Sequence, residues 1–184
     1  MSCLGNGQSS ISRSSDAWQL VATTSAIYTD AYRQTDFRAS PHEYRVGIGE
    51  QGVLLVQPYK SELLPLWRFR TPEVATASAA ALLEKFYAYR DAGDFVGMDM
   101  TRKYLKMGWT RSRHYANHKG GQKYEGAVPQ DKKGVSGAHG RAIKPLEPDP
   151  VKAECAAIFR TALDEAQCDP AYQQRFDQHR AAFG

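Results

Sequence analysis

Positively charged side chains are concentrated between residues 102 and 144 of this 184-residue chain. That segment holds eleven lysines and arginines against two acidic residues, a net charge of +9, whereas the whole chain carries only +4. A local excess of one sign attracts polyanions. Trp109, Tyr115 and Tyr124 lie among the cations, and such mixtures are typical of surfaces that stack bases and hold phosphates. The segment therefore predicts a nucleic acid, or another polyanion, as the partner.

Three cations from an earlier part of the chain, within residues 60–70, are expected to contribute further contacts to the nucleic acid. The predicted contacts are Lys60, Arg68, Arg70, Arg102, Lys103, Lys106, Trp109, Arg111, Arg113, His114, Tyr115, His118, Lys119 and Lys123. A basic run is also typical of a hydrated face whose aromatic rings turn into the core. A third interpretation is a protein-interaction factor whose basic face meets an acidic protein.

Two helices are predicted around Gly108, over 95–107 and 110–118, because glycine commonly ends a helix. Their lengths resemble a helix-turn-helix, and the second helix would carry Arg111 and Arg113. Such a helix places guanidinium groups against phosphates or guanine edges. Tight corners between helices also occur in many proteins that bind no DNA.

Gly47, Gly49 and Gly52 match the spacing of a dinucleotide-binding glycine loop. That loop must lead directly into a helix whose N-terminus meets the phosphates. Here a β-branched stretch and Pro58 follow instead, which predicts the turn of a β-hairpin. The alternative is that amides of this turn cradle a phosphate, in an enzyme or binding protein for a small phosphorylated ligand.

His114 and His118 are four residues apart, a spacing that puts two imidazoles on one helix face. Zinc needs three or four ligands, and neither His139 nor Cys155 stands at a spacing that supplies one. No metal and no cofactor are therefore predicted. The chain has no GxSxG motif and no clear nucleophile–base pair, so the sequence leaves open whether it is an enzyme.

The composition, 42% apolar and 24% charged, is typical of one globular domain. The predicted fold class is α+β, mostly α-helical, with a small antiparallel β-hairpin in the N-terminal third. Residues 1–29 are predicted to be a disordered tail and residues 30–184 a single domain. Residues 120–148 lack periodicity and predict a long basic loop.

Strands are predicted at 44–48 and 53–57, with a third near 66–70 where apolar and basic residues alternate. Helix starts are predicted at Thr71-Pro72, Asp149-Pro150 and Asp169-Pro170, where a capping side chain precedes proline. Asp94 is expected to cap the helix that begins at residue 95.

Five motifs give the chain a recognisable pattern. They are VGIGEQGVL at 46–54, PYKSE at 58–62, WRFRTPE at 67–73, GDFVGMDM at 93–100 and YANHKGG at 115–121. Together they resemble a family of small bacterial and phage proteins known only as a domain of unknown function. The resemblance implies a cytoplasmic protein whose domain starts near residue 30, and it supplies no catalytic residues. No stretch approaches the roughly 18 apolar residues of a spanning helix, so no membrane partner is predicted, and the oligomeric state is left open.

Overall fold

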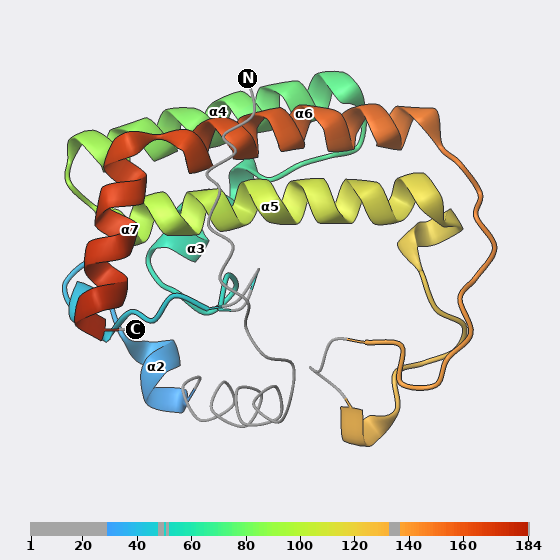
Figure 1. Ribbon diagram of the computed structural model, residues 1–184, viewed down its shortest axis with the longest axis horizontal. Coiled ribbons are helices and arrows are strands. Elements are labelled where there is room, and N and C mark those ends of the chain that lie inside the picture. Colours follow the sequence, from blue (N-terminus) through green and yellow to red (C-terminus); the bar gives the residue numbers. More distant parts are fainter. Residues whose placement is uncertain (1–28, 48–49, 51, 133–136, 184) are drawn as a thin grey trace, which may run out of the picture.

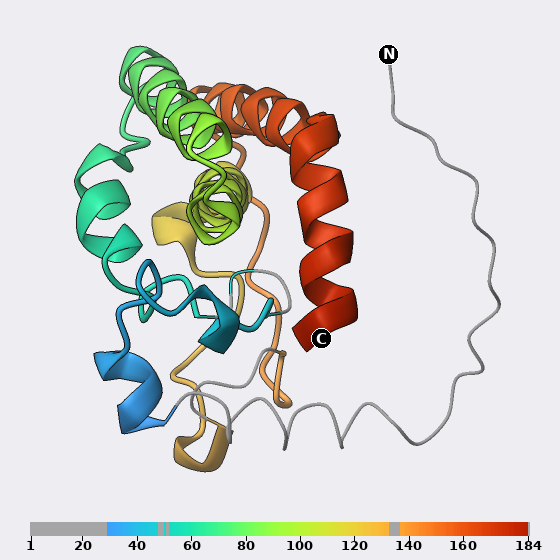
Figure 2. The ribbon, with the colours of Figure 1, turned by 90° about the vertical axis from the view of Figure 1, so that its left-hand side faces the viewer.

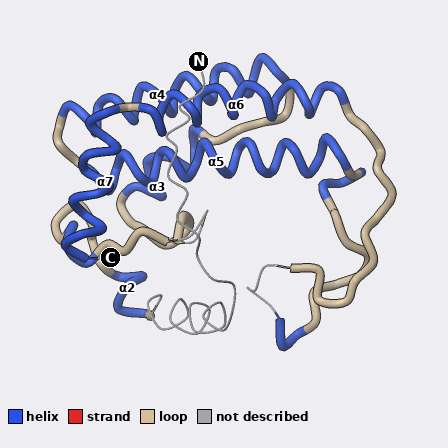
Figure 3. Tube along the Cα trace, in the orientation of Figure 1, coloured by secondary structure: helices blue, strands red, loops and turns tan. Residues whose placement is uncertain are grey.

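The computed structural model describes residues 29–47, 50, 52–132 and 137–183, and their regular structure is helical throughout (Figure 3). The α-helices are α2 (Asp30–Gln34), α3 (Tyr59–Leu63), α4 (Pro72–Asp91), α5 (Phe95–Asn117), α6 (Pro150–Cys168) and α7 (Pro170–Phe183). Short 3₁₀ turns occupy Pro41–Glu43, Leu64–Leu66, Lys119–Gly121 and Gln130–Lys132. The predicted α+β class is therefore wrong, because these residues contain no strand and no hairpin.

Helix α5 lies at the centre of the molecule (Figure 1). Helices α4 and α6 run antiparallel to it, and Figure 2 shows the three helices nearly end-on, in a triangle. The segment before α4, with α2 and α3, covers another side of α5, and α7 crosses near its N-terminal end. Because other elements surround it, every residue from 96 to 105 of α5 is buried.

The predicted helix starts are confirmed, each with a side chain that caps the free backbone N–H groups. The hydroxyl of Thr71 accepts a hydrogen bond from the N–H three residues later at 3.4 Å. The carboxylates of Asp94, Asp149 and Asp169 do the same at 2.9, 3.1 and 2.9 Å. Proline follows three of these four caps, at the helical position where its missing N–H costs nothing.

The helix break predicted at Gly108 is wrong, and α5 continues through this residue to Asn117. A Cβ atom at Gly108 would overlap the ring of Phe159 on α6. The glycine is therefore explained by the close approach of two helices and not by a helix end. The helix-turn-helix predicted over residues 95–118 is therefore wrong, because residues 95–117 form one helix.

The hairpin prediction fails because the apolar residues 53–56 form turns. The backbone N–H of Val53 bonds to the carbonyl of Glu50 at 3.2 Å, and that of Leu55 bonds to Gly52 at 2.9 Å. Val53 and Val56, three residues apart, are both buried. Their β-branched side chains therefore pack in the core although the backbone is not a strand. Residues 48, 49 and 51 lie outside the described part of the chain.

In place of the strand predicted near 66–70, Leu66 ends a 3₁₀ turn and residues 67–70 form an irregular segment that side chains of two helices hold in place. Arg68 N–H donates to the hydroxyl of Ser78 on α4 at 3.0 Å, and that hydroxyl donates to the carbonyl of Leu66 at 2.7 Å. The Lys152 ammonium on α6 donates to the carbonyls of Phe69 and Arg70 at 2.9 and 2.6 Å. These side chains satisfy backbone groups that a neighbouring strand would otherwise pair.

The basic loop after α5 has little regular structure in its described residues. One antiparallel bridge pairs Tyr124 with Ile143. The chain returning to α6 is tied to the end of α5 by backbone hydrogen bonds of 2.9 Å from Glu147 to Asn117 and from Asp149 to Ala116. The loop therefore starts and finishes beside the C-terminal end of α5 (Figure 1).

Candidate functional site

A cleft of about 500 Å³ opens where α4 and α6 begin and α5 ends. We call it the aromatic cleft; it is lined by Leu64, Trp67, Arg68, Phe69, Arg70, Tyr115 and Lys152. Its walls combine three aromatic rings with three cations, and no carboxylate of the described residues lines it. Clefts of this size hold small organic molecules or one unit of a polymer.

The three aromatic rings form a connected row. The ring centroids of Trp67 and Phe69 are 5.0 Å apart, and those of Phe69 and Tyr115 are 5.9 Å apart. Gly121 backs the Tyr115 ring, since a Cβ atom there would lie 2.7 Å from it, and its φ of +70° suits glycine. Tyr115 is nevertheless 38% exposed. Its ring is thus fixed in position and still accessible to a ligand.

Two of the three basic side chains of the cleft donate hydrogen bonds to backbone carbonyl groups. The Arg68 guanidinium donates to the carbonyls of Leu64 and Trp67 at 3.1 and 2.7 Å, and the Lys152 ammonium also bonds only to carbonyls. Arg70 is exposed. No ion pair involves any of the three within the described ranges. The cleft therefore carries a positive field.

Further cations lie close by on the second half of α5 and on the loop. Burial lowers the pKa of His114, and the charges of Arg111, Arg113 and Lys123 lower it further, while Glu50 opposes them. Arg111 precedes Tyr115 by four residues and so lies on the same helix face. The basic field thus extends from the cleft along α5.

Three of the predicted contacts lie in the interior and have protein partners. Arg102 is 7% exposed, Lys103 0% and His118 4%. The Nδ1 atom of His118 is 3.3 Å from the carbonyl oxygen of Pro145. Other parts of the protein therefore cover most of each of these three side chains, and their contact with a nucleic acid stays a prediction.

Arg102 and Lys103 belong to a buried network centred on Asp99. The Nε and Nη2 atoms of Arg102 donate to one carboxylate oxygen at 2.9 and 2.8 Å. The Lys103 ammonium is 3.5 Å from the other oxygen. The hydroxyls of Tyr44 and Tyr172 also donate to this carboxylate, so residues of α5, α7 and the N-terminal segment meet at one anion.

The charged side chains of this network shift the pKa values of their neighbours. Burial alone would raise the pKa of Asp99, but Arg102 and Lys103 outweigh it and hold the pKa well below its ordinary value. Burial lowers the pKa of Lys103, and the attraction of Asp99 only partly compensates. Two cations thus share one ionised carboxylate in the core.

The other predicted residues are dispersed. Lys60 belongs to α3, Lys106 to the middle of α5 and Lys119 to the turn that follows it. Gly52 has a φ of +78° in the turn, and Gly47 lines a different pocket that Arg102 also reaches. Gly49 lies outside the described residues.

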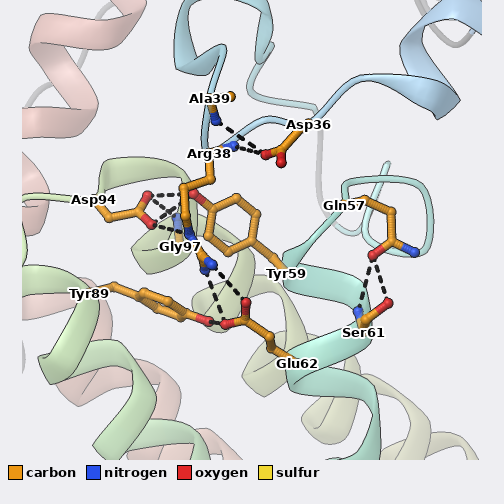
Figure 4. Close-up of polar contacts among 10 residues, drawn as sticks. All are labelled: Asp36, Arg38, Ala39, Gln57, Tyr59, Ser61, Glu62, Tyr89, Asp94 and Gly97. Atoms are coloured by element: carbon orange, nitrogen blue, oxygen red, sulfur yellow. Dashed lines mark hydrogen bonds and ion pairs between the residues drawn. The ribbon is translucent and has the colours of Figure 1, made fainter.

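A second polar cluster joins the N-terminal segment to α4 and α5 (Figure 4). The Arg38 guanidinium is 2.8 Å from the Glu62 carboxylate and stacks 4.9 Å from the Tyr59 ring. The Tyr59 hydroxyl donates to Asp94 at 2.7 Å, and Tyr89 donates to Glu62 at 2.6 Å. Because these groups satisfy one another, we interpret the cluster as structural.

Sequence reasoning missed the most important partners of the predicted residues. Lys152 and Trp67 complete the aromatic cleft, but they lie far from Tyr115 in the sequence, and no local pattern connects them. Asp99 had a usable signal, because it precedes Arg102 and Lys103 by three and four residues, the spacing of ion pairs on a helix.

A family model described as "Domain of unknown function (DUF4385)" matches residues 27–182. The chain belongs to this family. The match, which confirms the resemblance seen in the motifs, includes both the aromatic cleft and the Asp99 network. No curated protein and no solved structure matches the chain. Within the described residues, no helix combines the length and apolar character needed to cross a membrane.

Proposed function

We propose that the protein binds single-stranded nucleic acid through the aromatic cleft, with the exposed cations of α5 continuing the contact. The observation that carries this proposal is the row of three fixed rings among cations that pair with no carboxylate in the described part of the chain. A base stacks on Tyr115, while Arg68 and Arg70 hold the flanking phosphates.

Single strands suit this surface better than a duplex does. An unpaired base exposes its face and can enter a cleft of about 500 Å³, whereas a paired base is stacked inside its helix. Aromatic stacking contributes about 1–3 kcal/mol per base in proteins that bind single strands. The continuous helix α5 presents no helix-turn-helix to a major groove, so the structure favours stacking over groove recognition.

Fluorescence anisotropy of labelled single-stranded and duplex oligonucleotides over a series of salt concentrations tests the proposal. We expect single strands to bind more tightly, and the logarithm of the affinity to fall linearly with the logarithm of the salt concentration. Affinity that does not depend on salt, or no binding at low salt, would refute nucleic-acid binding. A preference for duplex would refute the stacking mode.

Replacing Arg68 and Arg70 together by glutamine tests the phosphate contacts. Each lost contact should reduce the steepness of the salt dependence by about 0.7 for a single strand. The matched control replaces Arg33 and Arg180, two exposed arginines on α2 and α7, and removes the same charge. Equal losses in both double variants would show that only net charge matters and that the cleft is not the site.

Replacing Tyr115 by leucine tests the stacking contact. The change keeps apolar bulk and removes the aromatic face, so we expect binding to weaken by about 1–3 kcal/mol. The salt dependence should stay as it is, because no cation is lost. A Tyr115→Leu variant with unchanged affinity would remove this ring from the site.

A further inference from the structure

A second pocket, of about 420 Å³, lies beside the buried Asp99 network. Its walls are Val46, Gly47, Arg102, Gln167, Tyr172, Gln173, Phe176 and Asp177. Arg102 precedes Tyr115 by 13 residues on α5, a separation of about 20 Å along the helix. The pocket is therefore distinct from the aromatic cleft and does not depend on the function proposed for it.

Among the described residues, Arg102 is the basic one that lines this pocket. Asp99 accepts hydrogen bonds from its Nε and Nη2 atoms, which leaves Nη1 without an acceptor among the described residues. The side chain is only 9% exposed, so surrounding groups fix its position and little water screens its charge. Lys103 lies 3.5 Å from the other oxygen of the same carboxylate, so Arg102 shares Asp99 with a second basic group.

The rest of the wall fits the organic part of a ligand. The rings of Tyr172 and Phe176 have centroids 5.8 Å apart on one face of α7. The side-chain amide of Gln173 donates to the backbone carbonyl of Gln167 at 2.9 Å and so closes the junction between α6 and α7. Asp177 is the one carboxylate of the wall, and it is exposed, so water screens its repulsion of an anion.

We propose that this pocket binds a small organic oxyanion, a carboxylate or a phosphate ester, whose charged group accepts a hydrogen bond from Nη1 of Arg102 and whose apolar body packs on Tyr172 and Phe176. Arginine presents several N–H donors in a planar fork that matches both oxyanions. A buried arginine held by a carboxylate needs no rearrangement to receive the ligand. Nearby Gly47 allows a ligand to approach the backbone, since it has no side chain.

Titrations of the full chain with benzoate, phenyl phosphate and neutral benzamide test this proposal. The readout is the NMR resonance of the Arg102 Nε–H group, together with the dissociation constant from the shift. We expect both anions to bind and to move that resonance, whereas benzamide should bind at least about tenfold more weakly. The stronger of the two anions identifies the preferred oxyanion. Equal affinity for benzamide and the anions, or no binding of either anion, would overturn the proposal.

Two neighbouring glutamines of α7 supply a matched pair of variants. Gln173 lines the pocket, whereas Gln174 is exposed and lies outside its wall. Gln173→Glu adds a negative charge beside the ligand and should weaken anion binding about tenfold or more. Gln174→Glu adds the same charge to the same helix and should leave binding nearly unchanged. Equal losses in both variants would mean that the anions bind elsewhere.

Arg102→Lys tests the anchor directly, because lysine keeps the charge and loses the planar fork. We expect the anions to bind about tenfold or more weakly while benzamide binding stays the same. If this variant does not fold, the Gln173 and Gln174 pair still decides the question, since both glutamines are exposed. A folded Arg102→Lys variant with unchanged affinity for both anions would overturn the role given to Arg102.

Discussion

At the scale of single residues, Asp99 joins parts of the chain that are far apart in sequence. Its carboxylate accepts from Tyr44 in the N-terminal segment, Arg102 on α5 and Tyr172 on α7. A buried ion pair adds little net stability compared with apolar packing, but removing one partner leaves the other charge uncompensated. The main contribution of Asp99 is therefore that it compensates the charge of the buried basic side chains beside it.

Asp99→Asn keeps the shape of the side chain and removes its charge. Arg102 and Lys103 would then lose the charge of the carboxylate that they share, so we expect the free energy of unfolding to fall by about 3–5 kcal/mol. Urea denaturation measures this change. Asp164→Asn is the control, because its pair with Arg160 is 48% exposed on both sides, and its loss should cost under about 1 kcal/mol. Similar costs for the two variants would contradict the role of the buried network.

The pKa shift of the same carboxylate implies that the free energy of unfolding depends on pH. Its pKa in the folded protein is held well below the ordinary value, which is near 3.9 for an unfolded chain. The folded state therefore binds this proton less readily, and the stability that Asp99 contributes is complete above about pH 5 and is lost as the pH falls toward the folded pKa. Urea denaturation at a series of pH values should show this loss, and the Asp99→Asn variant should show a flatter profile. Parallel profiles would assign the acid sensitivity to other groups.

At the scale of elements, the packing of α5 against α6 depends on a residue without a side chain. In an exposed helix, a Gly→Ala change such as Gly108→Ala would stabilise the helix by about 1 kcal/mol, because alanine has the higher helix propensity. At this position the new methyl group overlaps the Phe159 ring, and overpacking costs about 1–3 kcal/mol. We expect a net loss of stability, measured by thermal or urea unfolding.

A rescue variant separates the two effects at Gly108. Adding Phe159→Leu removes part of the ring that the new methyl group meets, so the double variant should lose less stability than the two single changes added together. If Gly108→Ala alone makes the protein more stable, the close contact does not explain the glycine.

At the scale of the whole molecule, the fold determines which cations act together. The loop returns to the end of α5, and this places Lys123 near Arg111 and Arg113, where all three lower the pKa of His114. Arg102 and Lys103 are separated from that field because they are buried against Asp99. The basic segment of the sequence therefore divides into a surface field and a core network.

His114 can report whether an anion occupies the surface field. Nearby phosphates favour the protonated imidazole, so single-stranded nucleic acid should raise the pKa of His114 toward or above its ordinary value. NMR titration of the histidine ring, with and without oligonucleotide, measures this shift, and a His114→Gln variant identifies the resonance. An unchanged or lowered pKa would place the nucleic acid elsewhere.

Local sequence patterns were sufficient to predict where the main helices begin. Thr71, Asp94, Asp149 and Asp169 cap the residues that follow them, and such local hydrogen bonds depend only on neighbours in the chain. The family was also recognisable from short motifs. The concentration of positive charge was also evident from the sequence, because counting charged residues requires no structure.

The conformation and burial of several segments instead depend on contacts between distant parts of the chain. Apolar residues 53–56 have the composition of a strand, but the described part of the chain contains no strand to pair with them, and residues 53–55 form turns. Gly108 has the residue type of a helix end, but it lies within α5, where the Phe159 ring packs too closely for a side chain. Burial and contacts between distant segments override local propensity, and the same contacts bring Trp67, Tyr115 and Lys152 from three separate parts of the chain into one cleft.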